Sequence, residues 1–414
     1  MPPRKFQIPA NEMFWEEAVK RAGLEGKTIH TLESMSSGSK IIPSQFLTFR
    51  VLCVPHQAHM FDAEKWELTE HMIPRNHQRH VMEAKRLTSQ KARLVDPDHV
   101  DAWSIIPTTD EEIVNFAIVD WLQAVCLRMP GVHGQWIASR YRFRARFGPN
   151  ELEARTDGAL RIFEEPERVH ALIECKAIAR KDALPAVQFQ EAAQIVAWLM
   201  QRHRPETAKA GGIFMVSEDR EEVFLTFGTL DRHYLRYLQN KDAPKKFLEL
   251  HTYGPFRIDS AGHMEQLASI VLAYVLRSAC LEKIDRYIHW EIDRVDGDRY
   301  AEAEDHGFPA RLVHETYRNA ILEDKERWDG ASIPKIREDL KDLVASRGAE
   351  IGEVVPRYTV CLVIDQQCRD SIVNAFEDPE ESKHGGGPGK GFVLMIDPMF
   401  VPGNREGYCK VYAS

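Results

Sequence analysis

Three polar residues on two neighbouring segments constrain the fold of this chain more than any other feature. Asp157 lies in a β-like segment at 152–162, and Glu174 and Lys176 lie two residues apart in the next one, at 170–178. Side chains two residues apart on a strand point to the same face. If the segments pair as a hairpin across the turn-like sequence between them, the first carboxylate lies beside the second. The sequence therefore predicts two acids and one ammonium on one face of a sheet.

Two carboxylates in one place need positive charge nearby. At a separation of about 4 Å and an effective dielectric constant near 20, they repel by roughly 4 kcal/mol. Without a cation, one of them is driven towards protonation. Lys176 supplies part of the compensation. The rest can come from Mg²⁺ bound by Asp157 and Glu174, because oxygen ligands suit that ion, or from the guanidinium of an arginine substrate.

Helical segments flank these strands. Residues 186–201 have the periodicity of a helix, and Gln190 and Gln194 are four apart, so both amides can face the same way. Residues 109–127 begin with a capping-box pattern and carry one apolar stripe. A further strand pair is predicted at 211–216 and 222–227. The order predicts an α/β fold (mixed α+β), a mixed central sheet flanked by helices. The stripe of the leading helix comprises Ile113, Ala117, Trp121, Leu122 and Val125.

Two basic segments raise the question of a polyanion partner. Between 140 and 147 arginines alternate strictly with apolar residues, which predicts a strand with one buried face. The segment 71–93 holds six cations against a single acid. Each set is either a solvated face or a surface that contacts phosphates. The alternating set is Arg140, Arg142, Arg144 and Arg146, and the second includes Arg75, Arg79, Lys85 and Arg86.

The overall charge and the cysteines narrow the class of protein. Lys and Arg number 54 against 63 Asp and Glu, a formal net charge of −9. A non-specific DNA-binding protein is usually basic overall, so any contact with nucleic acid must use a local basic surface. The seven cysteines are odd in number, and none forms a CxxC pair. This pattern predicts reduced thiols in a reducing compartment and no zinc ribbon.

The length of 414 residues suggests more than one structural region. We expect an N-terminal region with short helices at 1–105, a core at 106–290 and a C-terminal α/β extension at 291–414. Asn11 is a candidate N-cap for a helix over 12–21. Within the core, 229–290 is predicted to be mostly helical. Strands in the extension are predicted at 359–364, 392–396 and 408–412, and the glycine-rich stretch 383–391 is expected to be a surface loop, not a phosphate-binding P-loop.

No segment indicates a membrane or a secretory route. The N-terminus lacks an apolar core of signal-peptide length. The longest apolar run, 267–276, is about half of what a membrane span needs. We therefore expect a cytoplasmic protein with no membrane partner.

The motif and its surroundings resemble a known family. Thr156-Asp-Gly-Ala, Ala171-Leu-Ile-Glu-Cys-Lys176 and Val187–Trp198 resemble the fungal PD-(D/E)XK nuclease-like proteins, and so do Phe247–Pro255 and His263-Met. The likeness covers roughly 105–285 and implies a restriction-endonuclease-like core. It also implies that Asp157 and Glu174 are metal ligands, Lys176 the catalytic lysine, Gln190 the polar residue of the following helix, and Glu111 or Glu112 the acid of the leading helix. Gln194 stands where the related QxxxY pattern has tyrosine, and Thr156 where proline is often seen.

Three functions are compatible with this resemblance. Stand-alone fungal proteins of this kind include arginine-containing cyclodipeptide synthases, which use aminoacyl-tRNA and need no cofactor. Here the partners would be arginyl-tRNA and a second charged tRNA. Asp157 or Glu174 would hold the arginyl group, while Lys176 deprotonates the attacking amine or stabilises the oxyanion. The alternatives are a Mg²⁺-dependent nuclease and a non-catalytic nucleic-acid-binding protein.

Overall fold

The computed structural model describes residues 6–69, 110–127, 134–162, 165–201 and 212–300, and short segments between 332 and 412. The chain divides into two compact units, Met1–Ala279 and Cys280–Ser414. This division differs from the boundaries expected at 105 and 290. The N-terminal region supplies a strand of the central sheet, so it belongs to the first unit. The basic segment with Arg75, Arg79, Lys85 and Arg86 lies outside the described residues.

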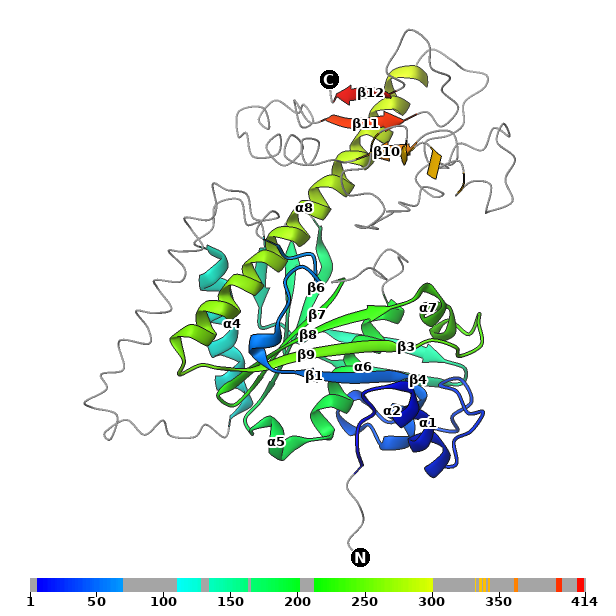
Figure 1. The fold of residues 1–414 in the computed structure, drawn as a ribbon, viewed down its shortest axis with the longest axis vertical. Coiled ribbons are helices and arrows are strands. Elements are labelled where there is room, and N and C mark those ends of the chain that lie inside the picture. The colour runs from blue at the N-terminus through cyan, green and yellow to red at the C-terminus, as the bar shows by residue number, and fades with distance from the viewer. Residues whose placement is uncertain are drawn as a thin grey trace, which may run out of the picture. The chain divides into compact units, whose positions relative to one another are not determined.

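The first unit is built on a seven-stranded sheet with the order β1-β9-β8-β7-β6-β5-β2 (Figure 1). Two neighbouring pairs, β1 with β9 and β6 with β7, are parallel, and the other pairs are antiparallel. The predicted mixed α/β class is therefore confirmed. The strands are β1 (Val51–His56), β2 (Gly134–Ile137), β5 (Gly158–Ile162), β6 (Glu165–Lys176), β7 (Ile213–Asp219), β8 (Glu222–Leu230) and β9 (Leu248–Arg257).

The predicted strand at 152–162 is in fact two strands in two sheets. β4 (Asn150–Arg155) pairs with β3 (Arg142–Phe147) in a separate two-stranded sheet, whereas β5 belongs to the central sheet. Thr156 and Asp157 form the junction: the first donates its backbone N–H to Tyr141 and the second to Ile173, each at 3.0 Å. The chain thus changes its pairing partner at Thr156 and Asp157, where alternation alone predicted one continuous strand.

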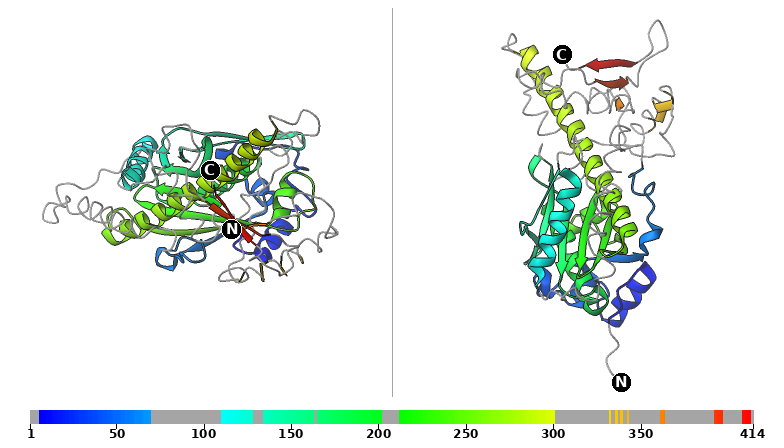
Figure 2. Two further views of the ribbon diagram at one scale, coloured as in Figure 1. Left: turned by 90° about the horizontal axis from the view of Figure 1, so that it is seen from above. Right: turned by 90° about the vertical axis from the view of Figure 1, so that its left-hand side faces the viewer.

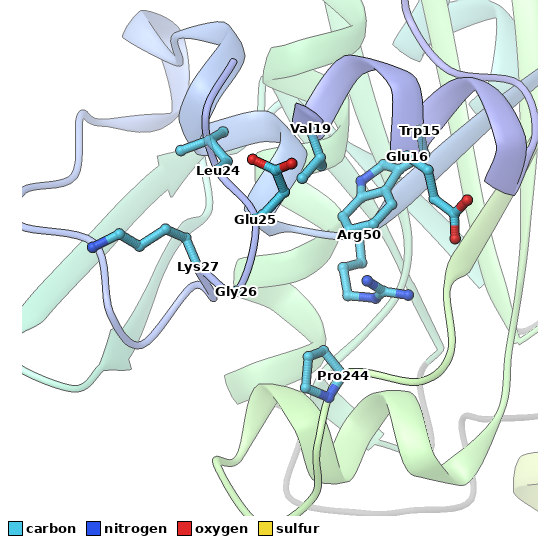
Figure 3. A pocket seen from close by; sticks show the side chains of 9 residues that line it. All are labelled: Trp15, Glu16, Val19, Leu24, Glu25, Gly26, Lys27, Arg50 and Pro244. Atoms are coloured by element: carbon cyan, nitrogen blue, oxygen red, sulfur yellow. The ribbon is translucent and has the colours of Figure 1, made fainter. Parts of the chain in front are cut away.

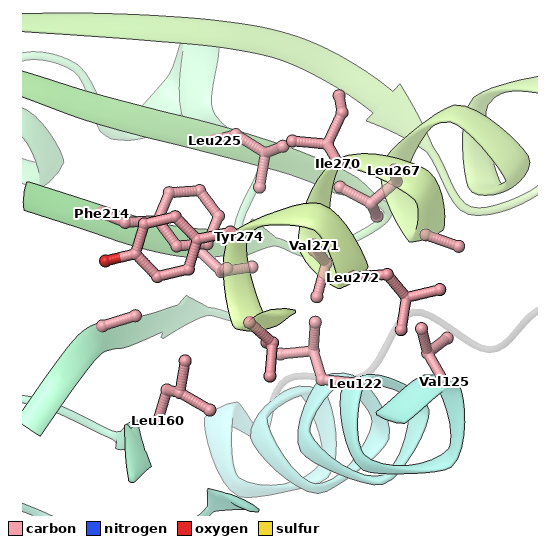
Figure 4. Packing of buried hydrophobic residues seen from close by; sticks show 14 of the residues in the cluster. Leu122, Val125, Leu160, Phe214, Leu225, Leu267, Ile270, Val271, Leu272 and Tyr274 are labelled. Atoms are coloured by element: carbon pink, nitrogen blue, oxygen red, sulfur yellow. The ribbon is translucent and has the colours of Figure 1, made fainter. Parts of the chain in front are cut away.

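Two helices cover one face of the central sheet. The helix α4 (Glu111–Leu127) lies beside the first part of α8 (Ala261–Tyr300), and Figure 2 shows both next to the strands. Figure 4 shows Leu122 and Val125 of α4 packed near Val271 and Leu272 of α8. Trp121, Leu122 and Val125 are buried as predicted. Ile113 and Ala117 are exposed, because the helix turns its buried stripe one position further, to Val114 and Ile118.

The other face is covered by α6 (Ala186–Gln201), which has the predicted bounds. Shorter elements surround this helix. The predicted cap of α1 is confirmed, since the Asn11 side chain accepts the Phe14 N–H at 3.0 Å. The remaining elements are α1 (Glu12–Arg21), η1 (Gly38–Lys40), α2 (Pro43–Thr48), η2 (Ala58–Met60), α5 (Arg180–Ala183) and α7 (Arg232–Leu238).

One central strand was not predicted. Residues 229–290 were expected to be mostly helical, but Leu248–Arg257 forms β9, buried between β1 and β8. Most of its side chains are buried, and the apolar–polar alternation over 248–251 stops at Thr252, so the pattern that marks a half-exposed strand is short.

The second unit contains a small antiparallel sheet of order β10-β11-β12. Its strands are Cys361–Val363, Phe392–Ile396 and Tyr408–Tyr412, at the three predicted places. The glycine-rich stretch 383–391 lies outside the described residues. Within the part of the chain that the structure describes, no helix combines the length and apolar character needed to cross a membrane.

Candidate active site

The end of β6 carries a buried carboxyl beside an ammonium. Glu174 is 1% exposed and faces α6, and Lys176 is largely buried beside it. The Lys176 Nζ donates to Oε1 of Glu174 at 2.6 Å and to the backbone oxygen of Cys175 at 3.0 Å. Cys175 itself points to the opposite core, where burial raises the pKa of its thiol well above the ordinary value. As alternation predicted, this thiol is a core group.

Two amides from α6 complete the surroundings of Glu174. Gln190 Nε2 donates to Oε1 at 2.5 Å, and Gln194 Nε2 donates to Oε2 at 2.5 Å. The Gln194 amide also donates to the backbone oxygen of Arg155 at 2.6 Å, which ties α6 to the end of β4. Each carboxylate oxygen therefore accepts at least one N–H. The four-residue spacing of the glutamines was the sequence signal for this arrangement.

Asp157 lies at the sheet junction beside this carboxyl. Its Oδ2 accepts the backbone N–H of Cys175 at 3.0 Å, and its Oδ1 lies 3.7 Å from Nε of Arg140. Asn115 of α4 donates to its backbone oxygen at 3.0 Å. The Asp157 side chain is 16% exposed, compared with 1% for Glu174, so it is the more accessible of the two acids.

The two acids at the start of α4 have different contacts. Glu111 Oε1 lies 3.6 Å from Lys176 Nζ. Glu112 Oε1 lies 3.7 Å from Arg140 Nη2, so it is connected to Asp157 only through that arginine. Consecutive helical side chains point in directions about 100° apart, which is why only one of the pair reaches the lysine. The resemblance left Glu111 and Glu112 as alternatives for the acid of the leading helix, with Glu112 the candidate catalytic residue, and the structure places Glu111, not Glu112, beside Lys176.

Burial sets the protonation of the pair. It raises the pKa of Glu174 to about 8, helped by the charge of Asp157 and only partly opposed by Lys176. Burial alone lowers the pKa of Lys176, but Glu174, Glu111 and Asp157 raise it more, so the net pKa lies above the ordinary value. The lysine is therefore an ammonium at neutral pH, where the buried Glu174 carboxyl tends to hold its proton.

The arrangement does not fit a magnesium ion. Magnesium needs free oxygen ligands in near-octahedral geometry. Both oxygens of Glu174 accept N–H groups at 2.5 to 2.6 Å, and Asp157 directs one oxygen at a backbone N–H and the other towards a guanidinium. Lys176 and two amides thus occupy the space around the predicted metal ligand. Among the described residues, no group of three or more His, Cys, Asp or Glu is arranged to hold a metal.

A second buried polar cluster lies on the same face of the sheet. Arg180 of α5 donates from Nε to Asp219 Oδ2 at 2.5 Å and from its Nη groups to Glu191 of α6. Ser217 Oγ donates to Glu191 at 2.6 Å. Asp219 is opposite Lys176 in the β6–β7 register, and Glu191 follows Gln190. Sequence reasoning missed this cluster, although an acid within the buried stripe of α6 indicates an opposite charge nearby.

Burial also raises the pKa of Asp219, to about 6, and Arg180 opposes this rise. The guanidinium packs over Phe224, with Cζ 4.2 Å from the ring centroid. Two buried carboxylates therefore bind one guanidinium through several hydrogen bonds, which is a favourable geometry for this cation. The cluster connects α5, α6 and β7 next to the Glu174 centre.

The arginine strand is less positive than its sequence suggests. β3 alternates between exposed and buried residues as predicted. However, Arg144 lies 3.0 Å from Glu153, and Arg146 lies 3.6 Å from Glu151. Both acids belong to β4, the neighbouring strand that pairing brings alongside. Arg142 is exposed and forms no ion pair with the described residues, so it is the member of the strand with uncompensated charge.

The fold and the site define a mixed α/β protein with a buried carboxyl, an ammonium and two amides at the end of a central strand. No protein-family model matches the chain, and no characterised protein or solved structure matches it. Function must therefore be argued from the site itself.

Proposed function

We propose that the protein is an arginine-containing cyclodipeptide synthase with a PD-(D/E)XK-like core, and that it acts on aminoacyl-tRNA in the cytoplasm. The observation that carries the proposal is the buried Glu174 carboxyl, both oxygens of which accept N–H groups from Lys176, Gln190 and Gln194. Aminoacyl transfer needs oriented substrates and stabilisation of a developing oxyanion. An ammonium that the positioned Glu174 carboxyl holds in place provides both without a cofactor.

The reaction consists of two aminoacyl transfers. In the first, the α-amine of one aminoacyl group attacks the ester carbonyl of the other, so that an amide bond forms and the ester C–O bond breaks. The proton lost by the amine goes to the ribose oxygen of the released tRNA. A second transfer closes the diketopiperazine ring and releases the other tRNA in the same way. Both aminoacyl esters are already activated, so the reaction requires no nucleoside triphosphate.

The geometry favours one role for Lys176. Its pKa lies above the ordinary value, so it remains an ammonium and stabilises the oxyanion instead of accepting a proton from the amine. Glu174 is too buried to touch a substrate and acts as a positioning residue that holds this ammonium. The sequence allowed either role for the lysine, and burial together with charge favours this one.

Asp157 is the residue that we assign to the arginyl group. Its Oδ1 already lies 3.7 Å from a guanidinium nitrogen of Arg140. The Arg140 side chain is 58% exposed, so a substrate guanidinium can take its place at small cost. A bidentate contact between a carboxylate and a guanidinium is specific for arginine over lysine.

The direct test uses purified protein with tRNA charged with arginine and, in turn, with each other amino acid. Mass spectrometry should detect a cyclic dipeptide that contains arginine, and EDTA should not reduce its yield. Lys176→Met should lose at least about a hundredfold in rate, the usual cost of removing an oxyanion donor, whereas Glu17→Gln, an exposed change on α1, should retain full activity. Absence of any cyclic product with every combination would reject the proposal.

The protein must also bind the charged tRNA, and we propose that Arg142 contacts the phosphate backbone of the tRNA. Arg142→Gln should weaken tRNA binding and lower the salt dependence of the affinity by about one phosphate contact. Arg144→Gln is the matched control, because Glu153 already neutralises Arg144. If the two substitutions weaken tRNA binding equally, the ion pair between Arg144 and Glu153 does not decide which arginine contacts the RNA, and the assignment of Arg142 is wrong. The proposed RNA surface also includes Arg140, Arg146, Arg75, Arg79, Lys85 and Arg86.

A Mg²⁺-dependent nuclease is the second candidate, favoured by the grouping of Asp157, Glu174 and Lys176. It requires the N–H donors around Glu174 to move away when the metal binds. Cleavage of DNA or RNA that EDTA abolishes and that Asp157→Ala removes would support it. Tight, salt-dependent RNA binding without any turnover would instead support the non-catalytic binding protein.

A further inference from the structure

A cavity of about 310 Å³ lies away from the residues of the candidate active site (Figure 3). It is formed by α1, the loop that follows α1, and two residues from later in the chain. This volume is at the small end of the range for ligand pockets in proteins. The lining residues are Trp15, Glu16, Val19, Leu24, Glu25, Gly26, Lys27, Arg50 and Pro244.

The lining contains a buried arginine with unused donors. Arg50 is only 8% exposed, and its Nε donates to the backbone oxygen of Lys246 at 3.1 Å. Its Cζ lies 4.2 Å from the ring centroid of Trp15 and 4.0 Å from that of Phe247, so two aromatic rings hold the guanidinium in place. Its two Nη groups form no hydrogen bond or ion pair with the described residues. In Figure 3 the guanidinium ends between Glu16 and Pro244.

A guanidinium in this position favours an anionic ligand group. Burial lowers the pKa of Arg50, and the nearby groups Tyr237, Glu12 and Glu16 only partly oppose this. A buried charge without a hydrogen-bonded counter-charge is costly. A carboxylate that accepts from both Nη groups would compensate this cost in a bidentate geometry. Because the aromatic contacts already fix the side chain, little conformational entropy is lost when such a ligand binds.

The other charges of the lining decide between kinds of anion. Glu16 and Glu25 balance Lys27 and Arg50, so the lining has no net formal charge. A phosphate dianion would meet two repelling carboxylates. A ligand that carries one carboxylate and one ammonium can place the carboxylate beside a cation and the ammonium beside an acid of the lining. Trp15, Val19, Leu24 and Pro244 add an apolar wall.

We propose that this cavity binds a small zwitterion of the α-amino acid class. The ligand carboxylate lies on Arg50, its ammonium lies towards Glu16, and its side chain packs against the apolar wall. The cavity shares no residue with the Glu174 centre, so this proposal stands or falls separately from the synthase proposal. It provides a site for a free amino acid, distinct from the esterified one.

The test is titration calorimetry of the whole protein with each free L-amino acid at millimolar concentration. At least one should bind saturably, and its α-amide and its N-acetyl derivative should bind at least about tenfold more weakly, a loss of about 1.4 kcal/mol. Inorganic phosphate should not bind in competition with it.

Variants assign the binding to this cavity. Arg50→Lys keeps the positive charge but loses the planar pair of N–H donors that binds a carboxylate in a bidentate way. Glu16→Gln removes the negative charge of one exposed lining residue. Each substitution should weaken ligand binding about tenfold. Glu17→Gln is the matched control, because this neighbouring acid does not line the cavity. The exposed Glu16 change keeps the test decisive if the Arg50 variant fails to fold. Absence of saturable binding by every amino acid would overturn the proposal, and so would equal affinity for the amidated ligand.

Discussion

Replacement of Glu174 by glutamine should remove a large pH dependence from the stability of the protein. The carboxyl has a pKa of about 8 in the folded protein, against an ordinary value of 4.5. The folded state therefore binds this proton more tightly than the unfolded chain does. The resulting stabilisation is complete below the unfolded pKa and is lost as the pH rises through about 8. Glu174→Gln has the shape of the protonated form and no proton to lose.

The magnitude follows from the two pKa values. Each unit of difference corresponds to about 1.4 kcal/mol of differential interaction. Between a pH of about 5.5 and a pH of about 8.5, linkage predicts that this carboxyl alone lowers the free energy of unfolding by about 3 kcal/mol. Lys176 adds nothing in this window, because its raised pKa keeps it charged throughout. The loss should be absent in the variant.

The assay is urea unfolding of both proteins at the two pH values. Glu218 and Asp219, whose pKa values burial raises to about 8 and about 6, lower the stability of both proteins alike. They cancel when the pH-induced change of one protein is subtracted from that of the other. Glu17→Gln should behave as the unaltered protein. If the changes for Glu174→Gln and the unaltered protein agree within about 1 kcal/mol, the pKa of Glu174 is not raised in the folded protein and our account of the site is wrong.

Two further substitutions test the architecture around the site. Arg180→Leu leaves Asp219 buried without its cation and should lower the free energy of unfolding by about 3 to 5 kcal/mol, measured in urea. It should also raise the pKa of Asp219 further, which pH-dependent unfolding can detect. Gly158→Ala should cost about 1 to 3 kcal/mol, because the added Cβ would lie 2.5 Å from the backbone oxygen of Ile137. Gly262→Ala, whose Cβ meets nothing within 4 Å, should not destabilise the protein; similar losses for both alanines would contradict the packing argument.

Local patterns in the sequence were sufficient for several elements. The bounds of α6, the cap of α1 and the strands β11 and β12 follow from periodicity, capping and alternation, which act over a few residues. The same short-range rules place Glu174 and Lys176 on one face of β6. They also place Gln190 and Gln194 on one face of α6.

Local sequence patterns did not predict the structure correctly where pairing with a segment distant in the sequence determines it. β9 is a central strand because β1 and β8 flank it, and its own sequence alternates only over 248–251. The arginines of β3 lose much of their charge because β4 pairs Glu151 and Glu153 with them. Neither pairing can be recognised from the segment alone.

By itself, the sequence determined which residue types share a face within each element, because that depends only on the local backbone period. Only the tertiary structure decided that Asp157 sits where the chain changes sheets, that Glu111 reaches Lys176, and that Arg180 neutralises Asp219. Contacts between elements depend on how whole faces pack, and burial then decides which charged groups keep their protons.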